Sequence, residues 1–195
     1  MTLSLPNADI LYIENFFDKT EADTLFKELL ETIVWQQGEI SMFGKKVLEP
    51  RLTAWYGDAG KTYKYSGKIN TPLDWNVPLL TIKSKIEQQV PSSVFNAFFN
   101  SVLLNLYRNG NDSMGYHADD EPELGKNPVI ASVNFGESRR FIVRRKDDKT
   151  VKHELLLTHG SLLIMAGEMQ HYWQHAVPKE PKKTKERINL TFRKL

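Results

Sequence analysis

The ten residues MGYHADDEPE (114–123) contain four carboxylates and one histidine, in a chain whose formal net charge is only +2. Carboxylates this close together repel one another unless a cation lies among them. His117 and Asp119 are two positions apart, so in an extended segment their side chains lie on the same face. A histidine and a carboxylate on one face are a ligand pair suited to a divalent metal ion.

A metal site at this position needs a further ligand from elsewhere in the chain. The sequence has no cysteine, so disulfides and thiolate sites are excluded, and the ligand must be His, Asp or Glu. Two histidines with one carboxylate occupy one face of an octahedron and leave three positions open, as in non-haem Fe(II) oxygenases. His175 is our candidate for the third ligand, and the alternatives are His153, His159 and His171.

The segment RINLTFR (187–193) alternates completely between polar and apolar side chains, which predicts a strand with two different faces. If the apolar face packs between sheets, the opposite face carries two guanidiniums, which need an anionic partner when removed from water. A dicarboxylate cosubstrate would pair with both. The alternative is a polar face over solvent. The polar face comprises Arg187, Asn189, Thr191 and Arg193, and in LLNLYR (103–108) the residues Asn105 and Tyr107 show the same alternation.

Two helices and a series of short strands are expected to position these residues. Apolar residues at helical spacing predict a helix over 20–35 with Thr20 and Asp23 as its capping pair, and a second helix runs from about Pro78 to Pro91. Residues 37–58 have a strand–turn–strand pattern with Gly44 in the turn. The later pattern is typical of a sandwich or barrel of jelly-roll type, with the helices supporting one sheet face. Its strands are expected at 101–108, 128–136, 139–146, 151–158, 160–167, 171–177 and 187–195.

Composition indicates an ordinary globular domain spanning residues 1–195, with 41% hydrophobic and 26% charged residues. No apolar run approaches the roughly 20 residues of a membrane helix, and residues 1–17 lack the features of a signal peptide. We therefore expect an intracellular monomer that does not bind membranes, cytoplasmic if bacterial and nuclear if eukaryotic. Basic runs at 139–146 and 179–187 either contact phosphates or form solvated loops.

Four blocks of the sequence resemble the AlkB family of Fe(II)- and 2-oxoglutarate-dependent nucleic-acid dealkylases, and most closely its subgroup that repairs double-stranded DNA. The blocks are NLYRNGNDSMGYHADDE, ASVNFGESRRFIVRRK, HGSLLIMAGEMQHYWQHAVP and RINLTFR, and the resemblance extends from about residue 36 to the C-terminus. It implies an α+β, mainly β fold with a double-stranded β-helix (jelly-roll) catalytic core over about 94–195. Residues 1–93 would then supply supporting helices and a nucleotide-recognition lid.

The resemblance also implies the metal and cosubstrate residues. Fe(II) would be bound by His117, Asp119 and His175, because His175 precedes AVP and so matches the family's His-X-X-Pro pattern. Iron, 2-oxoglutarate and O₂ would hydroxylate an N-methyl carbon with release of succinate and CO₂, and the product would lose formaldehyde. Arg187 and Arg193 would hold the two ends of 2-oxoglutarate, and its site would be completed by Asn105, Tyr107 and Thr191.

For the substrate, the resemblance implies 1-methyladenine or 3-methylcytosine in double-stranded or single-stranded DNA. These bases carry a positive charge, which Asp120 and Glu121 would favour over the neutral parent base. The alternative for Glu121 and Glu123 is an acidic turn in solvent.

Reaching the methyl group requires the base to be flipped out of the duplex. Tyr63 and Tyr65 are suited to stacking on the flipped base, and Phe43 is suited to filling the vacated stack as a wedge. Gly44, Lys45 and Ser66 complete the expected substrate contacts. Met42 before Phe43, and Tyr65 in place of a phenylalanine, depart from the subgroup and leave the preferred lesion open.

Four other functions compete with this interpretation. An RNA dealkylase of the same family, or a protein hydroxylase, would share the iron and cosubstrate residues. A non-catalytic reader of alkylated nucleic acid would not need three metal ligands and two arginines. A zinc or nickel jelly roll with hydrolytic chemistry would leave the paired arginines without a purpose.

Overall fold

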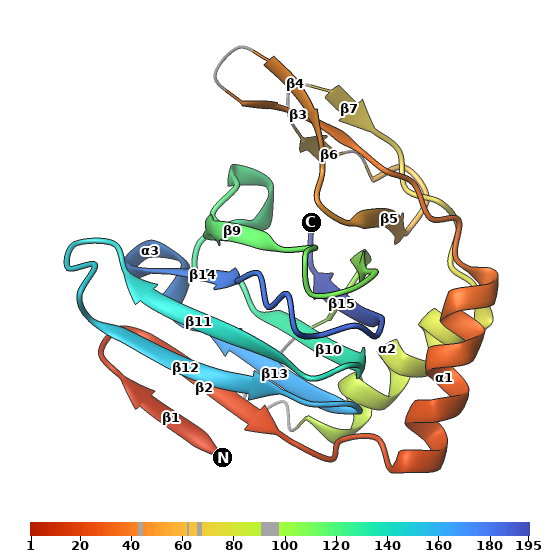
Figure 1. The fold of residues 1–195 in the computed structure, drawn as a ribbon, viewed down its shortest axis with the longest axis horizontal. Coiled ribbons are helices and arrows are strands. Elements are labelled where there is room, and N and C mark those ends of the chain that lie inside the picture. Colours follow the sequence, from red (N-terminus) through yellow and green to blue (C-terminus); the bar gives the residue numbers. More distant parts are fainter. Residues whose placement is uncertain (43–44, 62, 66–67, 91–97) are drawn as a thin grey trace.

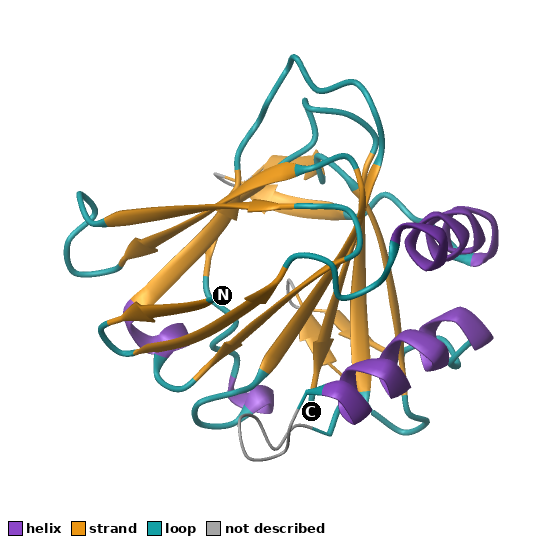
Figure 2. Cartoon of the chain, turned by 90° about the horizontal axis from the view of Figure 1, so that it is seen from below, coloured by secondary structure: helices purple, strands orange, loops and turns teal. Residues whose placement is uncertain are grey.

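The protein consists mainly of antiparallel strands in two facing sheets, with helices at the periphery (Figures 1 and 2). This computed structural model describes residues 1–42, 45–61, 63–65, 68–90 and 98–195. For residues 40–42, 45, 63–65 and 68–70 the backbone alone is described. The fold class predicted from the sequence, mainly β with supporting helices, is confirmed.

The larger sheet has the strand order β1-β2-β13-β10-β15-β8-β5 within the described part of the chain. The strand β15 lies near its centre and pairs with β10 on one side and β8 on the other. The strands β1, β2 and β5, which come early in the chain, were not predicted as members of the main sheet. The strands of this sheet are Thr2–Leu5 (β1), Ala8–Ile13 (β2), Leu52–Gly57 (β5), Ser101–Tyr107 (β8), Ile130–Gly136 (β10), Ser161–Ala166 (β13) and Arg187–Arg193 (β15).

The smaller sheet has the order β12-β11-β14-β9 and carries both histidines of the predicted metal site. The expected strand over 171–177 is shorter than predicted, because a helical turn, α3 (Met169–Tyr172), comes immediately before it. A short 3₁₀ helix, η1 (Pro122–Leu124), follows the acidic segment. The strands of this sheet are Met114–His117 (β9), Arg139–Arg145 (β11), Lys152–Leu157 (β12) and Trp173–Val177 (β14).

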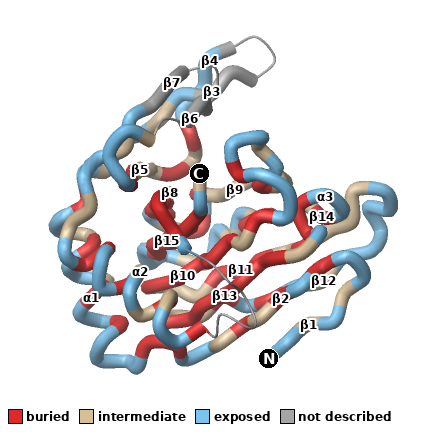
Figure 3. Tube along the Cα trace, turned by 180° about the vertical axis from the view of Figure 1, so that it is seen from behind, coloured by how far each residue is buried: buried red, intermediate tan, exposed pale blue. Residues whose placement is uncertain are grey.

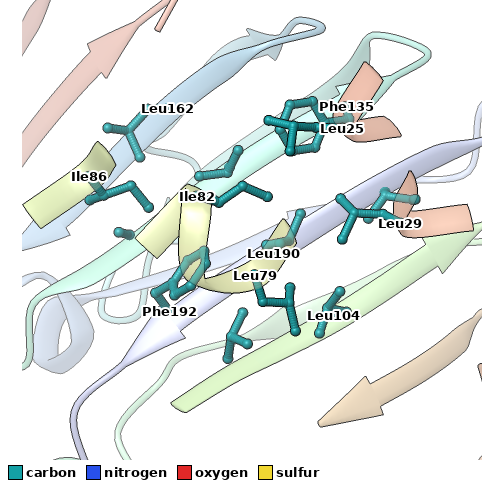
Figure 4. Packing of buried hydrophobic residues seen from close by; sticks show 14 of the residues in the cluster. Leu25, Leu29, Leu79, Ile82, Ile86, Leu104, Phe135, Leu162, Leu190 and Phe192 are labelled. Carbon is teal, nitrogen blue, oxygen red and sulfur yellow. The ribbon is translucent and has the colours of Figure 1, made fainter. Parts of the chain in front are cut away.

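Two helices, α1 (Lys19–Thr32) and α2 (Val77–Gln89), cover the outer face of the larger sheet. Leu25 and Leu29 of α1 pack beside Leu79, Ile82 and Ile86 of α2 in one hydrophobic cluster with the sheet residues (Figure 4). The helices therefore support one sheet face, as the sequence predicted.

The predicted capping pair of α1 was wrong, since the helix begins one residue before Thr20. Asp18 is the N-cap: its carboxylate accepts a hydrogen bond from the Glu21 N–H (2.9 Å), and the Glu21 carboxylate accepts one from the Asp18 N–H (3.1 Å). This reciprocal pair satisfies two backbone donors that would otherwise lack partners. Asp23 instead forms an ion pair with Lys19 and a hydrogen bond with His159 Nε2.

A second hydrophobic cluster lies between the two sheets. It joins Ile10 and Leu163 of the larger sheet to Phe141, Leu155 and Trp173 of the smaller one. Figure 3 shows that the central strands β10, β13 and β15 are buried, whereas exposed residues predominate along the outer helix α1. This cluster fills one end of the space between the sheets.

The alternation predicted for β15 is confirmed. We had considered its apolar face packed between the two sheets, but in the structure the apolar face packs against the helices. Ile188, Leu190 and Phe192 belong to the cluster under the helices, not to the cluster between the sheets. The polar face therefore looks into the space between the sheets, because the helices supply the apolar partner on the other side. The alternative of a polar face over solvent is wrong, since all seven residues of β15 are buried.

Two hairpins stand apart from the sheets, above β5 in Figure 1. The first pairs β3 (Glu39–Met42) with β4 (Lys45–Leu48), and its innermost pair is Met42 with Lys45. The second pairs β6 (Tyr63–Tyr65) with β7 (Lys68–Asn70). Within the described ranges, no helix is long and apolar enough to cross a membrane.

Candidate active site

The space between the sheets contains a cavity of about 370 Å³ that opens beside the predicted metal ligands. It is lined from the larger sheet by residues of β5, β8, β10 and β15, and from the smaller sheet by residues of β9, β11 and β14. Residues at the base of the first hairpin, Gly38 and Glu49, also line it. The cavity therefore connects the jelly-roll interior with the hairpins.

His117, Asp119 and His175 come together at one wall of this cavity. Each offers a ligand atom, and these atoms all lie within 4.8 Å of one another. His117 ends β9 and His175 lies opposite it on β14, where the two are register partners. Asp119 lies in the loop after β9, so it reaches the site without being part of a strand. The structure thus brings together the three residues that the sequence predicted.

The hydrogen bonds of these side chains leave ligand atoms available for a metal ion. His117 Nδ1 lies 2.9 Å from the Gly115 carbonyl oxygen, and because a carbonyl only accepts, Nδ1 carries the proton and Nε2 is left as the ligand atom. Asp119 Oδ1 accepts a hydrogen bond from Arg193 Nη2 (2.5 Å), whereas the buried Oδ2 has no hydrogen-bond partner among the described residues. A buried carboxylate oxygen without a donor fits a site for a cation.

The charges in the site keep Asp119 ionised and His175 neutral. Burial by itself raises the pKa of Asp119. The opposing effect of Arg193 and the two histidines is larger, so the pKa falls below its ordinary value, to about 2. Burial, together with the neighbouring His117, lowers the pKa of His175 to about 3. Metal ligation requires an ionised carboxylate and a neutral imidazole, so both side chains are in the form that binds a metal ion.

The other histidines that the sequence offered as the third ligand have different partners in the structure. His171 lies in α3 and hydrogen-bonds to Asn127 Oδ1 (2.9 Å). His159 Nε2 lies 3.1 Å from Asp23 at the helix α1. His153 lies on β12, where its ring packs beside the ring of Trp173. Among the described residues, the cluster that could hold a metal ion contains His175 as its third member.

A row of polar side chains runs across the larger sheet: Thr53, Asn105, Ser132 and Asn189 line the cavity, and Asn134 is buried beside them. Of this row, only Asn105 was predicted as a cosubstrate residue. The strand register places Asn105 opposite Thr53 on one side and Asn189 on the other, and Asn189 opposite Asn134. Asn189 Nδ2 donates to Ser132 Oγ (2.8 Å) and Asn134 Oδ1 (3.1 Å). The signal that could have identified Ser132 and Asn134 is the polar–apolar alternation of ASVNFG (131–136), which matches that of β15.

The two arginines of β15 lie in different surroundings. Arg193 lines the cavity and pairs with the metal-site residue Asp119. Arg187 is 1% exposed and donates through Nη2 to Asn134 Oδ1 (2.5 Å), while its Nε and Nη1 have no hydrogen-bond partner within the described part of the chain. Burial lowers the pKa of Arg187. Arg187 is not among the residues that line the cavity, but its guanidinium lies 4.9 Å from the ring centroid of Tyr107, which does line it. A buried guanidinium with donors to spare fits a carboxylate-bearing ligand.

The remaining predicted cosubstrate residues, Asn105, Tyr107 and Thr191, all line the cavity. Of the predicted substrate residues, Glu121 also lines it, whereas Asp120 is half-exposed and forms an ion pair with Lys146 (2.9 Å). Lys45 begins β4, and Tyr63 and Tyr65 are the ends of β6, with their backbone alone described. Phe43, Gly44 and Ser66 lie outside the described residues.

The fold and the site together define a class of protein. A jelly roll that holds two histidines and one carboxylate beside a buried arginine is the architecture of an oxygenase that uses iron and a dicarboxylate. The family model of the 2OG-Fe(II) oxygenase superfamily matches residues 9–193. The chain belongs to this superfamily, whose cofactors are Fe(II) and 2-oxoglutarate, as the sequence predicted.

Within this superfamily, the chain is similar to proteins of the AlkB type. The chain is 43% identical over 186 residues to the alpha-ketoglutarate-dependent dioxygenase alkB homolog 3 of Bos taurus, covering 91% of this chain and 63% of that protein. It is 41% identical over 189 residues to the human DNA oxidative demethylase ALKBH2, covering 92% of this chain and 70% of that protein. The resemblance to AlkB proteins is thus confirmed, and the chain spans a little under two thirds of the alkB homolog 3 relatives.

A solved structure shows the same fold at low sequence identity. The structure of OsALKBH1 superimposes with a TM-score of 0.71 and 17% identity, covering 98% of this chain and 100% of the other. At this identity the likeness supports the fold alone.

Proposed function

We propose that this protein is an Fe(II)- and 2-oxoglutarate-dependent dioxygenase that demethylates N-alkylated bases, 1-methyladenine and 3-methylcytosine, in DNA. The observation that carries the proposal is the cluster of His117, Asp119 and His175 at the wall of a cavity that also exposes Arg193. The similarity to proteins named as DNA oxidative demethylases supports DNA as the substrate.

In this proposal each part of the cavity has a defined task. His117, Asp119 and His175 hold Fe(II), which together with 2-oxoglutarate and O₂ supplies the chemistry that oxidises the methyl group. Arg193 binds one carboxylate of 2-oxoglutarate, and it keeps Asp119 ionised and correctly turned through the hydrogen bond to Oδ1. Arg187 binds the distal carboxylate with its spare donors. Asn105, Tyr107 and Thr191 position the cosubstrate between them.

The hairpins β3–β4 and β6–β7 would receive the flipped base and its duplex. They stand above β5 (Figure 1), and two residues at the base of the first hairpin, Gly38 and Glu49, line the cavity. Tyr63 and Tyr65 supply aromatic rings for stacking, Phe43 the wedge, and Gly44, Lys45 and Ser66 further contacts. Glu121, on the cavity wall, is the carboxylate that we assign to the cationic lesion. Asp120 can approach the cationic base only if the ion pair between Asp120 and Lys146 opens.

The test is a turnover assay with oligonucleotides that contain a single 1-methyladenine or 3-methylcytosine. With Fe(II), 2-oxoglutarate and O₂, we expect formaldehyde and succinate in equal amounts from DNA and none from unmethylated DNA. The same lesions in RNA serve as the second arm, because an RNA dealkylase would share every residue of the metal and cosubstrate sites. Binding of the lesion without formaldehyde release would favour a non-catalytic reader and contradict the proposal.

A further inference from the structure

A buried ion pair lies at the edge of the cavity, between the first hairpin and the predicted cosubstrate residues. Glu49 directly follows β4, and Arg51 lies two residues further on. Their side chains are 4% and 5% exposed, and Arg51 Nη2 lies 3.3 Å from Glu49 Oε1. Neither residue was predicted to have a role. A buried ion pair rarely stabilises a protein more than well-packed apolar residues of similar size would. We therefore looked for a functional role of this pair.

The pair is anchored at the base of the hairpin. The Glu49 N–H donates to the Gly38 carbonyl (2.8 Å), and Gln37 Nε2 donates to the Glu49 carbonyl (2.9 Å). A Cβ at Gly38 would lie 2.8 Å from Glu49 Oε2, so glycine at this position leaves room for the carboxylate. The backbone N–H and carbonyl of Glu49 are therefore both held by the residues that directly precede β3.

On its other side, the arginine contacts a residue of the cavity floor. Arg51 Nε donates to Asn105 Oδ1 at 2.7 Å. An arginine side chain has donors and no acceptor, so the atom of the Asn105 amide that faces it must be the oxygen. The Asn105 amide nitrogen, with its two N–H donors, is then directed away from Arg51. Because Asn105 lines the cavity, these donors are available to a carboxylate bound there.

We propose that Arg51 is a positioning residue for the cosubstrate: held by Glu49, it fixes the Asn105 side-chain amide so that its N–H donors face 2-oxoglutarate. This inference rests on the proposed function, which places 2-oxoglutarate in the cavity. Without Arg51 the amide can turn over and present its oxygen, which repels a carboxylate. The Glu49–Arg51 ion pair thus links the base of the first hairpin to the cosubstrate site.

The experiment measures 2-oxoglutarate binding by calorimetry in the absence of DNA, with Mn(II) as a redox-inert metal. We expect Arg51→Met to weaken 2-oxoglutarate binding about tenfold while metal binding changes by less than about threefold, a loss equivalent to one hydrogen bond. The matched control is Arg140→Met, which removes an exposed arginine–glutamate pair with Glu154 on β11 and β12 and should leave both affinities unchanged. A purely structural role would weaken metal and cosubstrate binding together.

A double-mutant cycle tests whether Arg51 acts through Asn105. In an Asn105→Ala background, Arg51→Met should cause no further loss, whereas a full additional tenfold loss would show that Arg51 contacts the ligand directly and would overturn the proposal. Asn105→Asp keeps an acceptor for Arg51 but turns a second oxygen toward the cosubstrate, so it should bind 2-oxoglutarate more weakly than Asn105→Ala. Binding by Asn105→Asp at the wild-type level would also overturn the proposal.

Removing Arg51 alone deletes the cation of a buried ion pair, which can unfold the protein. Glu49→Gln/Arg51→Met removes both charges, and we expect it to fold with the same tenfold loss of 2-oxoglutarate affinity. Normal affinity in this folded double variant would refute the positioning role. Failure of the wild-type protein to bind 2-oxoglutarate at all would instead refute the proposed function, so the two failures are distinguishable.

Discussion

Arg193 has two tasks in the proposed site, and its replacement should therefore affect two ligands. Its Nη2 donates to Asp119 Oδ1 at 2.5 Å, and it is the first of the groups that lower the pKa of this carboxyl. We expect Arg193→Ala to weaken the binding of 2-oxoglutarate and also that of the metal ion. The sequence alone predicted only the first effect.

The expected magnitudes follow from the contacts. A charge-assisted hydrogen bond contributes about 1.5–3 kcal/mol, and at about 1.36 kcal/mol per factor of ten its loss weakens 2-oxoglutarate binding by roughly one to two powers of ten. Loss of a group that orients a metal ligand costs about 10- to 100-fold in metal affinity. Arg193→Lys keeps the charge but not the planar fork, so its effects should be intermediate.

The assay separates the two effects by titrating each ligand at saturation of the other. Mn(II) binding is measured first without and then with 2-oxoglutarate, and turnover is measured over a range of 2-oxoglutarate at saturating Fe(II). Arg187→Ala is the matched control, because Arg187 contacts Asn134 and the Tyr107 ring, not Asp119. It should weaken 2-oxoglutarate binding and leave metal binding intact.

Two results would refute this reasoning. If Arg193→Ala loses metal affinity but binds 2-oxoglutarate normally at saturating metal, the residue serves Asp119 alone. If both arginine variants keep a normal 2-oxoglutarate requirement and lose DNA affinity, these side chains are phosphate contacts and the assigned cosubstrate site is wrong.

Three further predictions concern the ligands, acid stability and the wedge. His117→Ala, Asp119→Ala and His175→Ala should each abolish turnover in a folded protein, whereas His171→Ala, which removes a histidine bonded to Asn127, should remain active; formaldehyde release measures this, and substantial activity in any of the first three removes that residue from the triad. In chelator-treated protein, His175 has a folded pKa of about 3 against an ordinary value of 6.5, so its contribution to stability is complete above pH 6.5 and is lost as the pH falls toward 3. The melting temperature of His175→Asn should therefore fall less steeply with pH across this window than that of the wild-type protein, and parallel curves for the two proteins would contradict the lowered pKa of His175. Phe43→Ala should lower kcat/KM at least about tenfold on double-stranded lesions and less than about threefold on single-stranded ones, because only a duplex leaves a gap to fill; an equal loss on both, with a lower melting temperature, would identify Phe43 as a core residue.

Much of the site could be predicted from the sequence because it depends on local spacing. The alternation of RINLTFR places Arg187, Asn189, Thr191 and Arg193 on one face of a strand in any sheet that contains it. The helix under the sheet was predicted for the same reason, since helical spacing of apolar residues is a local property. Its cap was misplaced by two residues, because Asp18 and Thr20 are both good N-cap residues and the choice depends on where the chain leaves β2.

The spacing of the residues left four histidines open as the third member of the site, the family resemblance favoured His175, and the tertiary structure places it beside His117 and Asp119. Only the tertiary structure decided what lies on each side of β15. His171 and His175 are close in the sequence, but a helical turn before β14 directs the first to Asn127 and leaves the second opposite His117. The helices take the apolar face of β15 and so turn its polar face toward the smaller sheet. The contact of Arg51 with Asn105, 54 residues apart, has no local signature in the sequence, because it arises from the pairing of β5 with β8.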